Sequence, residues 1–532
     1  MAMRVTTKMM QNTSLRNLNT NKAREEKLLV QLATGKKISR PSDDPVIAIR
    51  ALKLNSSLDK INQYYEKNAS DAESWLDLTA AGIETVNGNL ADIRKAVNQL
   101  ANGDWENIDK KNMITSLKKA VEHIYTTGNA KSAERSLFTG YRTNLPLTFK
   151  EAKEEKYSIT EQLTNSAIGK FTYIKQGDLP DINEGNFGSI NTSEYYVSST
   201  DVFRIRLAYN DIAITPKLDA AGNPIVNGGK AEYEANISIE FGDFKNNVTT
   251  KYDTASAPND IKCFANATED AYTYVMDNPG KMAYVAETGE LLLGNDIKEQ
   301  LSKLDSSTEI RVNYEKDNWK VDDLDPVHYF YTERKDPITD RTLIYNPGFL
   351  EGGDKQIIEY DIGNNQTIRV NTTADELFGH GARRDVEEIN NMLEQYQTLE
   401  DNKATVKKMM ESGKYEGDDY TKLEQHLAAI EKAETMMRDK IEKRCGAMLT
   451  DVDGYIAKAT LAETDCGSRG SQLELIKNRL NVQKENYETL VSANEDADYP
   501  DLAIQLNSIR MTYQAALSSI SYVMQTSLLD FI

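Results

Sequence analysis

The chain has 532 residues, with 63 Lys plus Arg against 83 Asp plus Glu, which gives a formal net charge of −20. This length predicts roughly two to four domains with room for a substantial core. The negative charge argues against a nucleic-acid-binding protein or a protein of anionic membranes, because both partners would repel the chain unless a basic patch were segregated. The sequence contains no such run of Lys and Arg.

Three further features exclude other classes of protein. Cys263, Cys445 and Cys466 are too few for a disulfide framework and lack the close pairing of a zinc site. The chain has no apolar stretch of about 18 residues, so no membrane insertion is expected. The N-terminus lacks the core and cleavage site of a signal peptide. We expect a soluble protein, although export routes that read uncleaved termini stay open.

The first strong pattern is a long helix that begins at Pro45. The segment 39–45 places Asp44 at the N-cap and Pro45 at the first helical position, where a missing N–H group costs nothing. A heptad register follows, and 12 of its 15 seam positions are apolar, which predicts a helix that buries this seam. The seam positions are Ala51, Asn55, Leu58, Asn62, Tyr65, Ala69, Ala72, Leu76, Thr79, Ile83, Val86, Leu90, Ile93, Val97 and Leu100.

A second amphipathic helix follows a predicted turn at residues 103–107. Its seam contains Met113, Leu117, Val121 and Ile124. The chain then changes character, since nine of the 12 prolines lie between Pro146 and Pro347. Because proline is excluded from helix interiors, long helices are not expected there.

The middle of the chain alternates with a period of two residues, which predicts strands. In one strand Phe203, Ile205 and Leu207 alternate with Arg204 and Arg206, so the arginines are expected on an exposed face. Residues 237–241 repeat the pattern with apolar Ile237, Ile239 and Phe241. A hairpin is predicted to turn at residues 363–366, and Gly228 and Gly229 supply another turn. Residues 151–375 are therefore predicted to form a β-rich domain.

The C-terminal part returns to helical spacing. Three apolar stripes are predicted to lie on helices, and an acidic break ending in Pro500 separates the second from the third. This break is predicted to be a hinge or joint, formed by Asn494, Glu495, Asp496, Asp498 and Pro500. The stripes are Leu423, Leu427, Ile430, Met437 and Ile441; Leu473, Ile476, Leu480, Tyr487 and Leu490; and Leu502, Leu506, Ile509, Tyr513, Ala516, Ile520 and Val523.

The two ends of the chain carry opposite charges. Residues 1–50 contain ten Lys or Arg and four Asp or Glu, a net charge of +6, whereas residues 485–532 contain one Arg and seven acidic residues, a net charge of −6. Opposite charge and matching heptads predict that the two termini pack together, with electrostatics setting partner choice. The alternative is that the charge of any local segment fluctuates without consequence.

No catalytic constellation is visible. The sequence contains no P-loop, H-E-x-x-H, G-x-S-x-G or C-x-x-C motif. Adjacent Asp322 and Asp323 are expected to lie in a solvated charged stretch, and the Gly-His-Gly of residues 379–381 predicts a loop before a helix. His123 and His426 lie in helical patterns, where a solvated or capping role is expected. The segment 451–454 fails the ligand test of a calcium loop. We therefore expect no enzyme, no cofactor and no metal. The four histidines are His123, His328, His380 and His426.

Both ends carry motifs of a known family. Residues 32–38 (L-A-T-G-K-K-I) followed by Pro41, Asp43, Asp44 and Pro45 resemble a segment of the flagellin superfamily, in the form typical of the hook-associated protein 3 family at the hook-filament junction. The block around Gly140 and Tyr141 is similar to a motif of the same junction family. Residues 495–498, 513–517 and 527–531 resemble motifs that junction proteins share with flagellins.

This resemblance implies an α+β fold, with a long antiparallel helical coiled-coil bundle from the N- and C-terminal segments and an inserted β-rich outer domain. The expected domains are residues 1–45 with 495–532, residues 46–150 with 376–494, and residues 151–375. The helical stretch near 400–445 has no clear counterpart in the family. The outer domain has no role assigned by the resemblance.

The resemblance also implies a function. It indicates a structural subunit of the bacterial flagellum that joins the hook-associated ring to the filament, located outside the cell after export without a cleaved signal peptide. The expected partners are further copies in a ring, the preceding hook-associated protein, flagellin and an export chaperone. Two alternatives stay open: flagellin itself, and an adhesive or ligand-binding surface protein that acts through the β-rich insert.

The subunit contacts are expected on the apolar seams of the terminal helices. An isolated helix or helix pair that exposes such a seam would be marginal in water, so these segments are expected to order on assembly. The predicted interface residues are Leu15, Leu18, Leu29, Leu32, Leu502, Leu506, Ile509, Tyr513, Ala516, Ile520 and Val523.

Overall fold

A computed structural model describes residues 7–529 except 103–109, 176–181, 184, 188–196, 220, 228–229, 255–259, 306, 337–338, 352 and 354–355. The chain divides into two compact units. The first comprises Met1–Glu73, Tyr360–Ile368 and Ser471–Ile532, and the second comprises Ser74–Glu359 and Arg369–Gly470. The predicted turns at 103–107 and at Gly228 and Gly229 lie outside the described residues.

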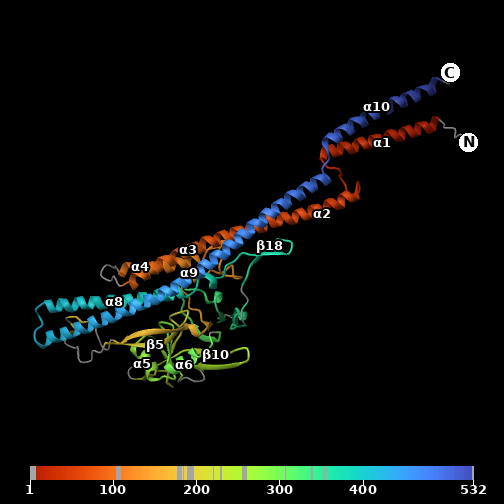
Figure 1. Ribbon diagram of the computed structural model, residues 1–532. Coiled ribbons are helices and arrows are strands. Elements are labelled where there is room, and N and C mark those ends of the chain that lie inside the picture. Colours follow the sequence, from red (N-terminus) through yellow and green to blue (C-terminus); the bar gives the residue numbers. More distant parts are fainter. Residues whose placement is uncertain are drawn as a thin grey trace. The chain divides into compact units, whose positions relative to one another are not determined.

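Long helices occupy both ends of the chain (Figure 1). The described helices that flank the β-rich middle are α1 (Thr7–Thr34), α2 (Pro45–Asn62), α3 (Ala69–Ala101), α4 (Lys110–Thr127), α8 (Gly381–Glu411), α9 (Asp418–Glu495) and α10 (Tyr499–Leu529). The stretch near 400–445, which the family resemblance leaves without a counterpart, is helical and belongs to α8 and α9.

The predicted start of the first long helix is confirmed. The Asp44 carboxylate accepts hydrogen bonds from the backbone N–H groups of Val46 and Ile47, and Pro45 opens α2. All ten seam positions from Ala69 to Leu100 are buried. One feature was not predicted: the segment Gln63–Asn68 between α2 and α3 is a π-helix, a local widening that heptad spacing does not reveal.

The middle of the chain forms two larger sheets and three small ones among the described residues. One larger sheet has the order β11-β10-β15-β3-β16-β17, and the other has the order β4-β5-β14-β13-β12-β9-β6. Both are antiparallel apart from the β12–β13 pair, which is parallel and joined through α5 (Glu269–Asp277). The predicted hairpin at residues 363–366 is confirmed as β18-β19. The protein is therefore of the α+β class.

The strands of the six-stranded sheet are β3 (Tyr157–Leu163), β10 (Ser238–Asp243), β11 (Val248–Asp253), β15 (Glu309–Lys316), β16 (Tyr331–Lys335) and β17 (Thr342–Tyr345). Those of the seven-stranded sheet are β4 (Ile168–Lys175), β5 (Ser198–Arg206), β6 (Thr215–Pro216), β9 (Tyr233–Glu234), β12 (Ile261–Phe264), β13 (Met282–Val285) and β14 (Glu290–Leu293). The short pairs are β1 (Lys131–Ser132) with β2 (Arg135–Ser136), β7 (Val226–Asn227) with β8 (Lys230–Ala231), and β18 (Glu359–Gly363) with β19 (Gln366–Arg369). A further helix in this region is α6 (Asn295–Ser302), and α7 (Ala374–Leu377) precedes α8.

The strand predicted around residue 205 is confirmed, but the predicted exposure of its arginines is wrong. Arg204 is 6% exposed, and the Arg206 side chain is 21% exposed. The reason is that α5 and α8 supply residues that pack on this face of β5: Val202 clusters with Ala271 of α5, and the arginines pair with acids of α8. Both faces of the strand are therefore covered.

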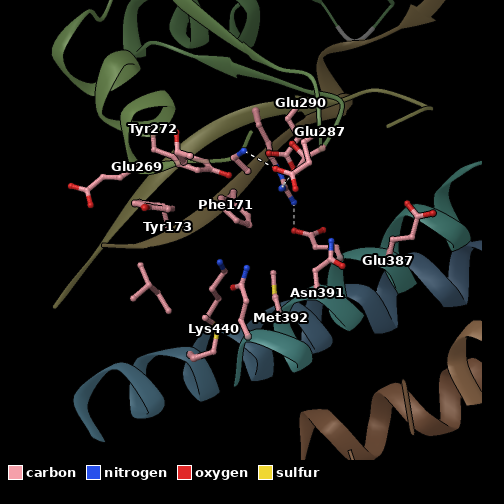
Figure 2. Close-up of a pocket in the computed structure, with 18 of the residues that line it drawn as sticks. Phe171, Tyr173, Glu269, Tyr272, Glu287, Glu290, Glu387, Asn391, Met392 and Lys440 are labelled. Carbon is pink, nitrogen blue, oxygen red and sulfur yellow. Dashed lines mark hydrogen bonds and ion pairs between the residues drawn. The ribbon is translucent and has the colours of Figure 1, made fainter. Parts of the chain in front are cut away.

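A cavity of about 940 Å³ lies in the second unit between the β4–β5 face and the helices α8 and α9. Figure 2 shows aromatic side chains of the sheet side facing polar side chains that rise from the two helices. At its edge, the buried arginines of β5 join the sheet to these helices.

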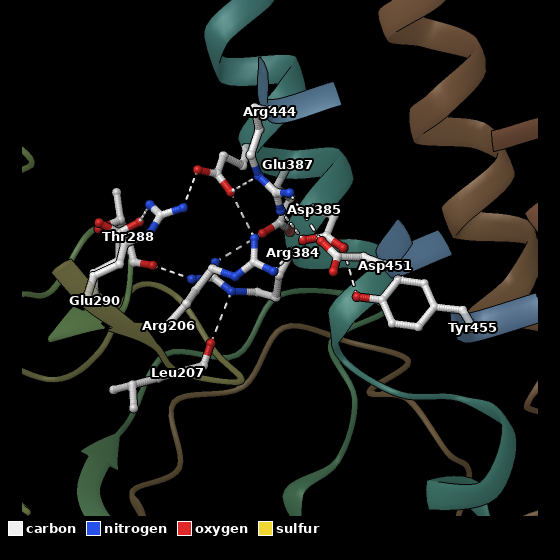
Figure 3. A network of polar contacts seen from close by, with 12 residues as sticks. Arg206, Leu207, Thr288, Glu290, Arg384, Asp385, Glu387, Arg444, Asp451 and Tyr455 are labelled. Atoms are coloured by element: carbon white, nitrogen blue, oxygen red, sulfur yellow. Dashed lines mark hydrogen bonds and ion pairs between the residues drawn. The ribbon is translucent and has the colours of Figure 1, made fainter. Parts of the chain in front are cut away.

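The polar network at this junction centres on two acids of α8 (Figure 3). Asp385, fully buried, pairs with Arg206 and with Arg444 of α9, and it accepts a 2.7 Å hydrogen bond from the Tyr455 hydroxyl. Glu388 accepts hydrogen bonds from Arg206 at 2.9 Å and from Arg444 at 3.0 Å. Burial raises the pKa of Glu388, but the surrounding arginines outweigh it and hold this pKa well below its ordinary value.

A buried carboxyl in the six-stranded sheet predicts a pH effect on stability. Burial raises the pKa of Glu161 to about 7, against hydrogen bonds from Tyr314 and the Ala208 backbone. The folded chain therefore holds a proton that the unfolded chain loses above its ordinary pKa of 4.5, so this residue lowers the free energy of unfolding as the pH rises from about 4.5 to 7. Glu161→Gln is expected to remove that decline.

The measurement is urea unfolding of the wild-type chain and of Glu161→Gln across this pH range. We expect the variant to be more stable at pH 8 by on the order of 3 kcal/mol, because a shift of one pKa unit corresponds to 1.36 kcal/mol. At about pH 4 the two chains should be equally stable. A difference that does not change with pH would contradict the assignment.

Candidate assembly surface

The terminal helices α1 and α10 form an antiparallel pair in the first unit, as Figure 1 shows. The buried residues of the pair are Leu28 of α1 with Leu502 and Leu506 of α10, and Leu32 and Ile509 pack partly buried against them. The predicted packing of the two termini is therefore confirmed. The core of this pair is small, so each buried leucine carries a large share of its stability.

The predicted joint lies where α9 ends and α10 begins. Two backbone hydrogen bonds tie it to the segment after α1: the Lys37 N–H donates to the Glu495 carbonyl at 2.7 Å, and the Ala497 N–H donates to the Gly35 carbonyl at 2.9 Å. Lys36 pairs with Asp496 at 2.7 Å, and this carboxylate raises the pKa of Lys36. The Lys36–Asp496 pair agrees with the predicted attraction between the positive N-terminal and the negative C-terminal segment.

The remaining joint residues connect to neighbouring helices of the same unit. Asn494 donates to the Ile47 carbonyl of α2 at 3.2 Å, and Glu495 accepts from Asn55 at 2.6 Å. Asp498 accepts from the Asp501 N–H at 3.3 Å, and Pro500 lies in the first turn of α10. The break is thus a corner whose residues have hydrogen-bond partners on both sides. One pair opposes the overall charge pattern, because Arg510 of α10 binds Glu25 of α1 at 3.0 Å.

The family-motif residues shape two separate loops. Asp43 accepts hydrogen bonds from the Arg40 and Ser39 N–H groups, and these bonds, that of Arg40 foremost, lower its pKa. Pro41 is exposed in this turn. In the second unit, Gly140 has a φ of +60°, and the Tyr141 N–H donates to the Gln356 side chain at 3.1 Å. An added Cβ at Gly140 would lie 2.3 Å from that side chain, so both conformation and space require glycine here.

The predicted interface residues divide into two groups. Leu18, Leu32, Ile509, Tyr513, Ala516 and Ile520 are half-buried, and Leu502 and Leu506 are buried within the pair. Leu15 and Leu29 of α1 are 50% and 40% exposed. The side chain of Val523 lies outside the described residues. The roles of all these residues in subunit contacts stay predictions.

Sequence reasoning missed a second apolar stripe on the helices of this unit. On α10, Ile504 and Met511 stand seven residues apart and are 68% and 65% exposed. On α2, Val46, Ile49 and Leu52 are 75%, 58% and 73% exposed. The sequence did contain a signal for this stripe, because Ile504 and Met511 are apolar and lie outside the predicted seam of their helix. Exposed apolar residues repeated at helical spacing mark a surface that another helix can cover.

The surrounding fold sets the state of His328, His380 and Asp323. Burial lowers the pKa of His380 to about 3 and that of His328 to about 4, so both rings are neutral at physiological pH. Asp323 was predicted to be solvated, and this is wrong: it is 6% exposed because Arg383 of α8 covers it at 3.0 Å. The solvated or capping role predicted for His426 is also wrong, because this side chain is fully buried within α9.

In the described part of the chain, no three or more His, Cys, Asp or Glu side chains gather in a way that could hold a metal ion. Within the same ranges, none of the helices combines the length and apolar character that a membrane span requires.

Residues 5–143 match the family described as the bacterial flagellin N-terminal helical region. The curated relatives include flagellar hook-associated protein 3 of Salmonella typhimurium and of Escherichia coli, each 25% identical over 142 residues. These matches span 26% of this chain and 44% of each relative, so the similarity reaches less than half the length of those proteins. The resemblance to hook-associated protein 3 is confirmed.

Solved structures of flagellar proteins are similar at low scores. A flagellar hook-associated protein of Vibrio parahaemolyticus shares 13% identity, with a TM-score of 0.33, over 85% of this chain and 100% of that chain. Hook-associated protein 3 of Legionella pneumophila shares 9% identity, with a TM-score of 0.29, over 83% of this chain and 97% of that chain. Scores at this level do not define a common fold.

Proposed function

We propose that this chain, which is similar to flagellar hook-associated protein 3 over 142 residues, is a structural subunit of the bacterial flagellum that joins the hook-associated ring to the flagellin filament. Its partners are further copies of itself in a ring, the preceding hook-associated protein, flagellin and an export chaperone. It acts outside the cell, after export without a cleaved signal peptide. Its role is mechanical rather than catalytic.

The observation that carries this proposal is the apolar surface left open on the first unit. The α1–α10 pair buries three leucines, while the second stripe of α10 and the start of α2 expose apolar side chains at helical spacing. A helix pair with so small a core is marginal alone and gains stability when neighbouring helices cover the open stripe. A subunit at a filament joint needs such a stripe, because further copies of the chain and flagellin would cover it on assembly.

The domain division follows from the same proposal. Residues 1–45 with 495–532 form the inner domain that makes the subunit contacts, residues 46–150 with 376–494 form the helical rod, and residues 151–375 form the outer domain. The joint from Asn494 to Pro500 connects the inner domain to the rod. Its hydrogen bonds to the segment after α1 support a connection that transmits force between the two.

The double variant Ile504→Glu, Met511→Glu tests the open stripe. Both side chains are exposed, so the α1–α10 pair should still form. Assembly would bury the two carboxylates in an apolar contact, which costs several kcal/mol, so filaments per cell should fall by more than about tenfold. The measurement is filament counting and swimming in cells that carry only the variant.

A matched control is Asn507→Asp, which adds a carboxylate at an exposed polar position of the same helix. Its filament count should equal that of the wild type. Normal filaments with the double variant would contradict the proposal. Loss of filaments with both variants would show that the effect is one of charge and not of the apolar stripe.

A further inference from the structure

The cavity in the second unit has walls of two kinds. On the sheet side, Phe171 and Tyr173 of β4 stand half-buried on Tyr272 of α5, with ring centroids 5.8 Å and 4.2 Å from it. On the helix side, Asn391 and Gln395 of α8 are exposed, one turn apart, and both line the cavity. Neither amide makes a hydrogen bond with another described residue. Figure 2 shows Phe171 and Asn391 on opposite sides of the space.

Lys440 of α9 is the unusual group of this cavity. The residue is 9% exposed, and its ammonium lies 4.2 Å from the centroid of the Phe171 ring. It makes no ion pair or hydrogen bond with a described residue. Burial lowers its pKa to about 8, although Glu388 of α8 and Glu290 of β14 raise it, and Arg204 of β5 lowers it further. A buried ammonium that has an aromatic ring but no carboxylate as its partner is costly, and an anion in the cavity would relieve that cost.

The other cations of the cavity are already paired. Arg204 binds Glu290 and Glu388, and Arg206 binds Asp385 and Glu388. Arg384 binds Glu387, and Lys230 binds Asp270. Carboxylates thus line the cavity beside every arginine, and they would repel a ligand of high negative charge such as a phosphate ester. A ligand with a single negative charge fits this lining, because Lys440 alone among the described cations lining the cavity lacks an ion pair.

The remaining contacts specify the rest of the ligand. Two unpartnered amides can donate to and accept from hydroxyl groups. The Phe171 ring already carries Arg204 at 4.1 Å and Lys440, so the partly exposed Tyr173 ring is the flat apolar surface offered to aliphatic C–H groups. Pockets typically combine such aromatic surface with a few placed polar groups that set orientation. A sugar ring carries both hydroxyls and an aliphatic face, and a sugar acid adds one carboxylate.

We propose that this cavity binds a saccharide unit that bears one carboxylate. The carboxylate pairs with Lys440 beside Phe171, the sugar ring lies against Tyr173, and its hydroxyl groups bond to Asn391 and Gln395. This inference is independent of the flagellar role proposed above. It gives the β-rich region a binding function that assembly does not require.

Calorimetric titration of the full chain with sodium glucuronate, glucose, benzoate and inorganic phosphate tests the proposal. Glucuronate should bind, and glucose, benzoate and phosphate should bind at least about tenfold more weakly, because each lacks either the carboxylate or the hydroxyls, and a hydrogen bond to a charged group accounts for about one order of magnitude. A trisaccharide that contains glucuronate separates the sources: tighter binding than the monosaccharide points to a polymer, and equal binding points to a free sugar acid.

The variants Lys440→Gln and Asn391→Ala should each weaken glucuronate binding, the first by about tenfold or more. Lys443→Gln, at an exposed position in the same helix, should leave it unchanged. Affinity should also fall as the pH rises from about 7 to about 9, because Lys440 loses its proton. Equal affinity for glucose and glucuronate, unchanged binding by Lys440→Gln, or no binding of glucuronate would overturn the proposal.

Discussion

Replacing Leu506 by aspartate is expected to separate α1 from α10 and to abolish assembly. Leu506 is 8% exposed and packs in a core whose other buried members are Leu28 and Leu502. An unpaired carboxylate cannot be accommodated there, and helices without tertiary packing are marginal in water. Hydrogen exchange of residues 7–34 and 499–529 should rise by more than about tenfold, and cells that carry only this variant should not form filaments.

The second unit provides the internal control for this variant. Its sheets and the α8–α9 pair contain no residue of the α1–α10 core, so its unfolding should not change. Comparison with Ile504→Glu, Met511→Glu then separates two effects: the Leu506 variant should lose both the helix pair and assembly, whereas the double variant should lose assembly alone. Slow exchange of α1 in the Leu506→Asp chain would contradict the account of the pair.

Replacing Asp385 by alanine is expected to cost about 3–5 kcal/mol of the stability of the second unit. The fully buried carboxylate pairs with Arg206 and Arg444, so its removal leaves buried guanidinium groups incompletely paired. The measurement is urea unfolding followed by tryptophan fluorescence, because Trp75 and Trp319 are both buried in this unit.

Asp451→Ala is the matched control for Asp385→Ala. Asp451 also binds Arg444, at 3.1 Å, but its side chain is 44% exposed. An exposed ion pair contributes about 0.2–1 kcal/mol, so the control should change stability little. Equal losses from the two variants would show that burial does not set the strength of this network.

The helical flanks were predictable because their signals are local. Capping by Asp44 and Pro45, the heptad seam up to Leu100, and the break before Pro500 depend on residues close together in the sequence. The structure confirms the cap, the burial of the seam from Ala69 onward and the end of α9 at Glu495. The π-helical segment at 63–68 escaped prediction because its apolar spacing does not differ from that of an ordinary helix.

The interior of the second unit was not predictable from local pattern. Alternation around residue 205 predicted a strand, but only the position of α8 shows that Arg204 and Arg206 are covered. Lys440 is one of many charged residues in its helix. That it lacks an ion pair is visible only in the folded structure, where the nearby carboxylates pair with other cations. Asp323 was misassigned for the same reason, since its partner Arg383 lies 60 residues away in the sequence.

The packing of α10 against α1 was predictable from the apolar seam, whereas the role of that seam in subunit contacts stays a prediction. The main seam of α10 was read correctly as apolar, and the structure places its first members in the pair with α1. The exposed stripe with Ile504 and Met511 was not predicted, because the sequence of a single helix does not indicate which of two apolar faces its own chain covers.

Immunogold electron microscopy with an antibody against residues 151–375 tests the central claim most directly. Flagellated cells that make this protein should show label in a single band where the hook meets the filament. Label along the whole filament would assign the chain to the filament itself, as a flagellin. Either that result or label absent from flagella would contradict the junction role.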